Sequence, residues 1–166
     1  MAKYWNENEQ LIQGDNLLLY LVDSGHVLAY ATSCSVQIDA ESIDTSSKFS
    51  CKWASAMGGK AGYTISADAL YASLSGATSG IALSFDTLIE HMVKGDQIEW
   101  YMGEEVETND PCDENAHRLN TSATYYNGKA VVTSCSLEAG NNAIASCSIT
   151  LTGAGEIQKN GAKIGS

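Results

Sequence analysis

Basic charge is scarce in this sequence. Lys and Arg together number 9 against 20 Asp and Glu, so the formal net charge is −11, and charged residues make up only 17% of the chain, below the usual quarter. Proteins that grip nucleic acid neutralise its phosphates with Lys and Arg, so this balance excludes a DNA-gripping role. It indicates either a surface that repels DNA or simply an acidic surface that keeps the protein in solution. So few solvating charges also favour a chain that buries much of its surface against neighbours.

Cysteine pairs and long apolar runs are missing too. The cysteines are odd in number and form no CxxC pair, which argues against a disulfide framework and a zinc site; they are Cys34, Cys51, Cys112, Cys135 and Cys147. We expect free thiols in a reducing cytoplasm. The longest apolar run, residues 17–22, is far shorter than the roughly 20 residues that span a bilayer. The polar first 16 residues carry no secretory signal, so we expect no membrane association.

Catalytic motifs are absent as well. The histidines His26, His91 and His117 fall in separate contexts and in no metal-ligand spacing such as HExxH. The sequence also lacks a GxSxG elbow, a P-loop and a dinucleotide-binding glycine motif. We therefore expect no enzymatic activity, no catalytic residues, no cofactor and no metal. A Ca²⁺ site among the carboxylates of residues 104–114 is an alternative, but the stretch lacks the EF-hand spacing, and a solvated loop explains it better.

Most of the chain is patterned as β-structure. Apolar and polar residues alternate with a period of two, which is typical of half-buried strands, along residues 26–39, 62–71 and 97–102. Asp23-Ser24-Gly25 predicts a hairpin turn after residues 17–22. Asn127-Gly128 predicts a type I′ hairpin before a strand at residues 129–138, which then turns at residues 139–142 into a strand at 143–152.

Helical patterning is confined to residues 84–94. Ser84 is a suitable N-cap, Gly95 a suitable C-terminal glycine, and the apolar residues between them recur at helical spacing. Residues 40–61 and 103–120 predict two long irregular loops, which in compact domains are usually functional. The predicted fold class is mainly β: an antiparallel β-sandwich or barrel with one α-helix at about residues 84–94 and long loops.

Three stretches, taken in order, resemble a known family. Residues 31–70 contain a small-residue strand, an acidic junction, a loop with a Trp and a Gly pair, and the strand YTISADAL. Residues 84–103 read SFDTLIEHMVKGDQIEWYMG, and residues 128–157 end in LTGAGEI. In this order and spacing they resemble the major tail (tail tube) proteins of long-tailed bacteriophages. The polar start and the acidic stretch at residues 103–120 have no counterpart that we can match.

The resemblance implies a structural virion protein in the phage tail, made in the bacterial host cytoplasm. Its subunits would form stacked, six-membered rings around an inner β-barrel, a tube through which DNA passes from capsid to host without specific binding. Its partners would be further copies of the chain and the tape-measure, tail-tip and terminator proteins. Residues 1–16 would be an N-terminal arm, residues 17–157 a single tail-tube β-sandwich domain, and residues 158–166 a C-terminal tail.

The resemblance also assigns contact residues. Residues 41–62 correspond to the family's loop against the adjacent ring, with contacts expected at Asp44, Ser46, Ser47, Lys48 and Trp53. The face of small polar side chains on the long strands is expected to line the lumen at Gln37, Asp39, Ser134, Ser136 and Glu138.

Two alternatives stay open at this point. A phage-derived relative, such as the inner tube of a contractile injection particle or of a gene-transfer particle, has the same kind of subunit. A monomeric β-sandwich module that binds a ligand or carbohydrate is the other, with Trp5, Trp53 and Trp100 as sugar-stacking residues. Such a module stays monomeric at high concentration, whereas a tube subunit assembles.

Overall fold

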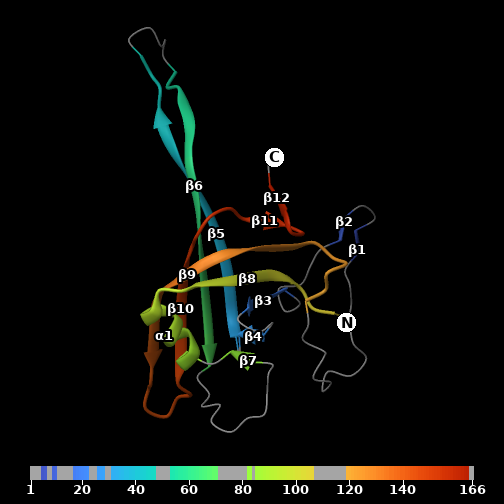
Figure 1. Cartoon of the computed structure of the whole chain (residues 1–166), viewed down its shortest axis with the longest axis vertical. Helices are drawn as coiled ribbons and strands as arrows, with labels where there is room; N and C mark the ends of the chain where they lie inside the picture. The colour runs from blue at the N-terminus through green and yellow to red at the C-terminus, as the bar shows by residue number, and fades with distance from the viewer. Residues whose placement is uncertain are drawn as a thin grey trace.

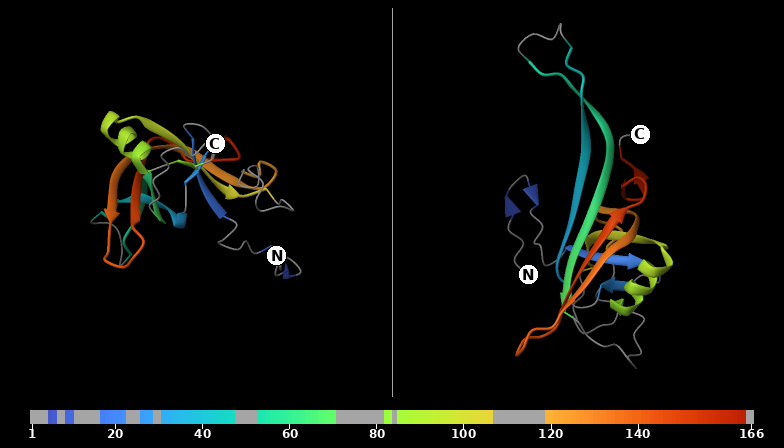
Figure 2. Two further views of the ribbon diagram at one scale, coloured as in Figure 1. Left: turned by 90° about the horizontal axis from the view of Figure 1, so that it is seen from below. Right: turned by 90° about the vertical axis from the view of Figure 1, so that its left-hand side faces the viewer.

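The chain folds into mainly antiparallel strands with a short helix around one hydrophobic core (Figures 1 and 2). The computed structural model describes residues 5–6, 9–10, 17–22, 26–28, 31–47, 53–70, 82–83, 85–106 and 119–164. The elements in chain order are β1 (Trp5–Asn6), β2 (Glu9–Gln10), β3 (Leu17–Val22), β4 (His26–Leu28), β5 (Ala31–Asp44), β6 (Ala56–Leu70), β7 (Ala82–Leu83), α1 (Phe85–Lys94), β8 (Gln97–Glu104), β9 (Tyr125–Glu138), β10 (Ser146–Gly153), β11 (Gln158–Lys159) and β12 (Ala162–Lys163). The mainly antiparallel β fold class is confirmed.

Four long strands form one layer, in the order β5-β6-β10-β9, and each is antiparallel to its neighbour. On β6 the side chains of Tyr63, Ile65, Ala67 and Ala69 are buried, while the residues between them are exposed or half-buried. The alternation predicted for residues 62–71 is therefore confirmed. It leaves this layer with an apolar face against the core and a polar face away from it.

Strand β9 joins this layer to a second one. Its residues 130–138 pair with β10, and its residues 125–131 pair with β8, which continues the sheet through β3, β4 and β7. The second layer crosses the long strands in Figure 1 and lies on one side of them in Figure 2. Trp100 on β8 is fully buried in the single core that both layers share. The sheet is not closed into a barrel within one chain.

The predicted hairpin at Asn127-Gly128 is wrong, because β9 runs straight through both residues. Neither has a positive φ; Gly128 instead meets Trp100 across the β8–β9 ladder. A Cβ added at Gly128 would lie 2.7 Å from Tyr63 Oη and 3.1 Å from Trp100 Nε1. The glycine here gives room for buried aromatic rings. The Asn-Gly turn of this chain is at residues 160–161, with φ of 51° and 74°, between β11 and β12.

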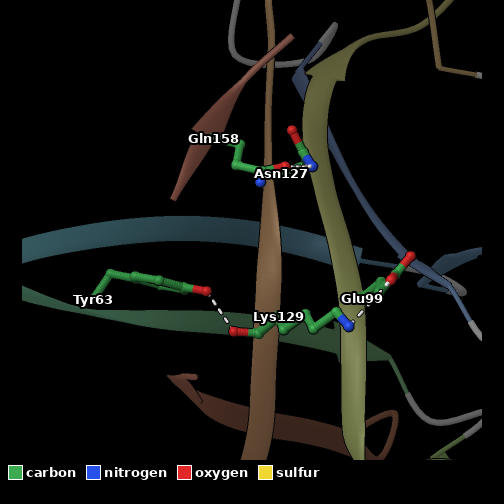
Figure 3. A network of polar contacts seen from close by, with 5 residues as sticks. All are labelled: Tyr63, Glu99, Asn127, Lys129 and Gln158. Atoms are coloured by element: carbon green, nitrogen blue, oxygen red, sulfur yellow. Dashed lines mark hydrogen bonds and ion pairs between the residues drawn. The ribbon is translucent and has the colours of Figure 1, made fainter. Parts of the chain in front are cut away.

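Polar contacts tie β9 to its surroundings at this crossing (Figure 3). The Tyr63 hydroxyl donates to the Lys129 carbonyl, and the Lys129 ammonium lies 3.8 Å from Glu99. Asn127 donates from Nδ2 to Gln158 Oε1 at 3.0 Å. Through this contact and the β11–β9 pairing, residues 158–163 pack onto the body of the fold.

The helix is confirmed at Phe85–Lys94, with Gly95 at φ 72° directly after it. The Gly95 and Asp96 amides both donate to the His91 carbonyl, at 2.9 and 3.2 Å, which closes the last turn. Leu88 is fully buried and Met92 packs against the core, whereas Val93 is 79% exposed. The buried face of α1 therefore includes fewer of its apolar residues than predicted. The proposed cap Ser84 lies outside the described residues.

The irregular loop predicted at residues 40–61 is wrong. β5 continues to Asp44 and β6 starts at Ala56, so the two strands form a long hairpin that projects away from the body (Figure 1). We call its outer part, residues 40–47 and 53–61, the arm. The arm's residues are exposed apart from the half-buried Gly59. Of the second predicted loop, residues 107–118 lie outside the described residues.

The strand predicted at residues 26–39 corresponds to two strands, β4 and β5, which have different partners. Other predicted turns and strands fit the structure. β3 and β4 pair antiparallel, as the Asp23-Ser24-Gly25 turn requires, although that turn itself is not described. β9 and β10 form the hairpin predicted around residues 139–142, where Asn142 has a φ of 62°. Within the described ranges, no helix has the length and apolar content needed to cross a membrane.

Candidate functional site

The outward side of the four-stranded layer is a broad face of small polar side chains. We call it the polar face. Register and alternation place on it residues from all four strands, exposed or half-buried: Ser33, Ser35, Gln37, Asp39, Thr64, Ser66, Asp68, Ser148, Thr150, Thr152, Ser134, Ser136 and Glu138. Apolar members occur at its margins, at Leu70 and Val131. A face of this kind presents hydroxyls and backbone to water, with little apolar surface for a ligand to bury.

The charges on the polar face are all negative among the residues that the structure describes. They come from Asp39, Asp68 and Glu138. The described lysines lie elsewhere: on the arm, on α1, on the part of β9 paired with β8, and on the terminal hairpin. Three of them are within ion-pair distance of a glutamate on the same elements or close by. The polar face therefore repels phosphate.

Asp68 stands near the middle of the polar face, held by two hydroxyls. Ser148 on β10 donates to its Oδ1 at 2.6 Å, and Ser33 on β5 donates to its Oδ2 at 2.9 Å. These hydrogen bonds, that of Ser148 first, lower the pKa of the Asp68 carboxyl below its ordinary value. The cluster links β5, β6 and β10 on their water-facing side and keeps the carboxylate charged.

The predicted lumen residues all lie on the polar face, at its two lateral strands. Gln37 and Asp39 come from β5, where the Gln37 amide donates to both Asp39 carboxylate oxygens at 3.0 and 3.2 Å. Ser134, Ser136 and Glu138 come from β9 and are exposed. Their assignment to a lumen stays a prediction.

The predicted lumen residues did not include any from the two central strands of the polar face, although both strands were themselves predicted. Thr64, Ser66 and Asp68 on β6, with Ser148 and Thr150 on β10, lie between the predicted groups. The period of two in residues 62–71 already separated the β6 residues from the core. What it lacked was the strand order, which puts β10 between β6 and β9.

The arm carries most of the predicted ring-contact residues. The Ser46 amide donates to Asp44 Oδ1 at 2.8 Å. Hydrogen bonding by the Ser46 side chain first, and by this amide second, lowers the pKa of the Asp44 carboxyl. Thr45 and Ser46 form hydrogen bonds with Ser55, so the contacts between the two sides of the arm extend to these residues. Ser47 is exposed, and Lys48 lies outside the described residues.

Apolar side chains stand exposed on the same arm and at its base. Trp53 is 85% exposed, and Ile43 lies opposite Met57 with both in contact with water. At the base, Ile38 is 58% exposed. Large apolar residues on a projecting hairpin indicate a surface made to be covered by another chain.

The long-strand layer also has two open edges in the described part of the chain. β5 pairs only with β6, and residues 132–138 of β9 pair only with β10. Unpaired edges attract other strands and are normally covered or shortened. Here both edges lie beside the same polar face.

The histidines and cysteines considered in the sequence analysis do not form a metal site within the described residues. No cluster of three or more His, Cys, Asp or Glu side chains is placed to hold a metal ion there. Cys34, Cys135 and Cys147 are free, and burial raises the pKa of each thiol, which keeps it protonated. His91 is half-buried on α1, with Nδ1 3.9 Å from Asp96 Oδ2. Cys51, Cys112 and His117 lie outside the described ranges.

Two of the tryptophans that the sugar-binding alternative requires, Trp53 and Trp100, do not share a surface. Trp100 has no exposed surface, because it lies in the core against Tyr63 with ring centroids 5.5 Å apart. It therefore cannot stack on a ligand together with Trp53, which is at the exposed end of the arm.

Comparisons with known proteins agree with this reading of the fold. The chain is similar in structure to a chain of the virion of a native gene transfer agent particle, with a TM-score of 0.65 and 16% identity over 90% of this chain and 98% of that one. It is similar to the tail of an empty gene transfer agent particle with C6 symmetry, at TM-score 0.64, 16% identity, and 89% and 98% coverage. It also resembles the SPP1 tail tube, at TM-score 0.63, 13% identity, and 93% and 81% coverage.

Sequence comparison identifies the family. No curated protein sequence matches the chain. The sequence model described as phage tail tube protein matches residues 11–159, most of the chain. The resemblance inferred from three sequence stretches is thus confirmed, and this chain belongs to the phage tail tube protein family.

Proposed function

We propose that this chain forms six-membered rings that stack into a phage tail tube, with the polar face turned toward the lumen. The observation that carries the proposal is the polar face itself: four long strands with water-facing hydroxyls and carboxylates, flanked by two open edges. Open edges that are complementary in neighbouring copies close a ring through head-to-tail contacts. The C6 symmetry of a structurally similar tail supports the number six.

The chemistry of the polar face suits a conduit for DNA. Asp39, Asp68 and Glu138 repel the phosphate backbone, and the hydroxyls between them offer no cationic site at which DNA would stop. DNA therefore passes from capsid to host without specific binding. In this arrangement Gln37, Ser134 and Ser136 line the lumen beside these carboxylates.

The arm, in this proposal, contacts the adjacent ring. Its length carries it beyond the body of the subunit (Figure 1), and its exposed Trp53, Ile43 and Met57 would be covered there. The contact residues we propose are Asp44, Ser46, Ser47, Lys48 and Trp53. Removing this apolar surface from water would favour stacking.

The remaining partners follow from the same role. We propose that the chain also binds the partners that the family resemblance implies: a tape-measure protein, a tail-tip protein and a terminator. Assembly takes place in the bacterial host cytoplasm. The family's role is structural, and we propose that the chain has no enzymatic activity.

Cysteine labelling tests which face lines the lumen. In a variant whose native cysteines are replaced, Ser136→Cys reacts with a bulky maleimide in unassembled subunits and is protected in assembled tubes. The matched control is Val93→Cys on the exposed side of α1, which stays reactive in both states. Full reactivity of residue 136 in intact tubes contradicts the orientation proposed here.

A further inference from the structure

The two open edges are compatible in direction. β5, β6, β10 and β9 alternate in direction, so β5 and β9 run opposite to each other. If copies stand side by side around a ring, β5 of one copy lies next to β9 of its neighbour and is antiparallel to it. The ladder of the four-stranded layer can therefore continue from copy to copy without a break.

A row of paired residues across one copy defines the register that the junction would have in a sheet without strand tilt. Cys34 on β5 pairs with Ala67, Ala67 with Ile149, and Ile149 with Cys135 on β9. All four lie on the core side of the layer. In a sheet with no strand tilt, Cys135 of one copy would meet Cys34 of the next.

In a closed barrel the strands are tilted, so the residue of the neighbouring β5 that lies opposite Cys135 is displaced along the strand from Cys34. A tilt of about 35–45° with strands about 4.8 Å apart displaces neighbouring strands by about one residue each. Across the four strands of one copy the shift is about four residues, and an even shift keeps the two faces in phase. Cys135 then meets either Ile38 or residue 30 of the neighbouring β5.

Side-chain exposure selects the direction of the shift. Ile38 is 58% and Leu137 48% exposed, although both lie on the core side of the layer. The shift toward the arm places Ile38 opposite Cys135 and Val36 opposite Leu137, so these apolar groups cover one another. The opposite shift would set Leu137 against Leu28 and Glu138 against Val27 of β4, a strand that already pairs with β3 on one side and β7 on the other. With no shift, Leu137 would meet the polar Thr32, and Ile38 would stay uncovered.

Two further observations agree with the shift toward the arm. Near the level of zero shift, Cys34 is half-buried on the core side, where its thiol donates to the Leu17 carbonyl at 3.8 Å, so a neighbouring copy would cover less of its surface than of Ile38. On the polar face, the shifted register sets each carboxylate against a hydroxyl: Asp39 meets Ser134, and Glu138 meets Ser35. No two carboxylates lie directly opposite one another.

We propose that residues 35–39 of β5 pair antiparallel with residues 134–138 of β9 from a second copy, with Ile38 opposite Cys135. This inference rests on the ring assembly of the proposed function and adds the edges and the register that form it. Directly opposite residues in such a pair have Cβ atoms about 4.5–5.5 Å apart, within reach of a disulfide after a small adjustment.

Disulfide crosslinking tests the register. In a background that retains Cys135 and lacks the other four cysteines, Ile38→Cys is assembled and oxidised. We expect the monomer band to be lost to a ladder of disulfide-linked oligomers. A second variant, Val36→Cys with Leu137→Cys in a background lacking all native cysteines, gives the same ladder and guards against misfolding of the first. The matched control retains only the native Cys34 and Cys135 and stays monomeric on the gel.

The outcomes separate this inference from the proposed function. Crosslinking of Cys34 to Cys135 in place of residue 38 overturns the register. Intact tubes in which neither designed pair crosslinks overturn the pairing of these two edges while leaving the tube role in place. Failure of the folded wild-type chain to form rings or tubes at all contradicts the proposed function, and the register with it.

Discussion

At the scale of single residues, Asp68 shows how the polar face keeps its charge. The hydroxyls of Ser148 and Ser33 donate to it, so its pKa in the folded chain lies below its ordinary value of about 3.9. Such a carboxylate contributes stability above its unfolded pKa, and the contribution is lost as pH falls through the folded pKa. Because Asp68 is exposed, solvent screens the effect and keeps it small.

Replacing Ser148 by Ala should raise the pKa of Asp68 toward the ordinary aspartate value, because the largest lowering contribution is removed. NMR titration of the Asp68 carboxyl carbon measures this shift. Ser136→Ala is the matched control, since that hydroxyl donates to the Ser148 carbonyl and to no carboxylate. An unchanged Asp68 titration in Ser148→Ala would contradict the assigned hydrogen bond.

Glycine packing against Tyr63 is a second residue-scale feature. A Cβ on Gly153 would lie 2.6–2.7 Å from three ring carbons of the buried Tyr63. We expect Gly153→Ala to destabilise the fold by about 1–3 kcal/mol, the usual result of overpacking a core. Chemical denaturation measures the free energy of unfolding. Gly62→Ala, whose new Cβ meets nothing within 4 Å, should cause no comparable loss; equal losses would show that the ring contact is not the cause.

At the scale of elements, the helix and the alternating strands were predicted correctly, because their patterns depend on residues that are close together in the chain. The helix at Phe85–Lys94 and the period of two in β6 and β8 were readable because burial on one side gives each pattern its spacing. The same alternation in residues 26–39 placed Gln37 and Asp39 on a water-facing side, and the lumen assignment made with the family resemblance added Ser134, Ser136 and Glu138. These residues share a single face only through the strand order, a long-range property.

The predictions that were wrong concern residues whose structure depends on contacts with distant parts of the chain or on the absence of burial. Asn127-Gly128 and Asn160-Gly161 carry the same local signal, yet only the second pair forms the turn. Gly128 is needed for the approach of Tyr63 and Trp100, which are distant in sequence. The strands of the arm were predicted as an irregular loop because both of their faces are exposed. A strand without a buried face shows no alternation of apolar and polar residues.

The arm yields a prediction at this scale. Because Trp53 is 85% exposed, Trp53→Ala should leave the stability of the subunit within about 0.5 kcal/mol while strongly reducing tube formation. Thermal unfolding and electron microscopy of the same samples measure the two effects. Val93→Ala, at a similarly exposed site on α1, should assemble normally. Tubes formed equally well by both variants would exclude Trp53 from the ring contact.

At the scale of the whole molecule, a single subunit has strand edges and apolar groups that only an assembly would cover. The long-strand layer ends in two open edges, the arm exposes apolar groups, and the polar face carries only negative charge among its described residues. A monomeric protein gains nothing from these features, and open edges expose it to aggregation. Stacked rings satisfy the edges and the arm together and leave the polar face to water and DNA.

The central claim is that this chain assembles with itself into a hollow tube. The most direct measurement is negative-stain electron microscopy of the concentrated, untagged protein beside size-exclusion chromatography of the same sample. We expect rings or tubes of uniform width with a stain-filled centre. A protein that folds yet elutes as a strict monomer, with no rings at high concentration or salt, would contradict the account.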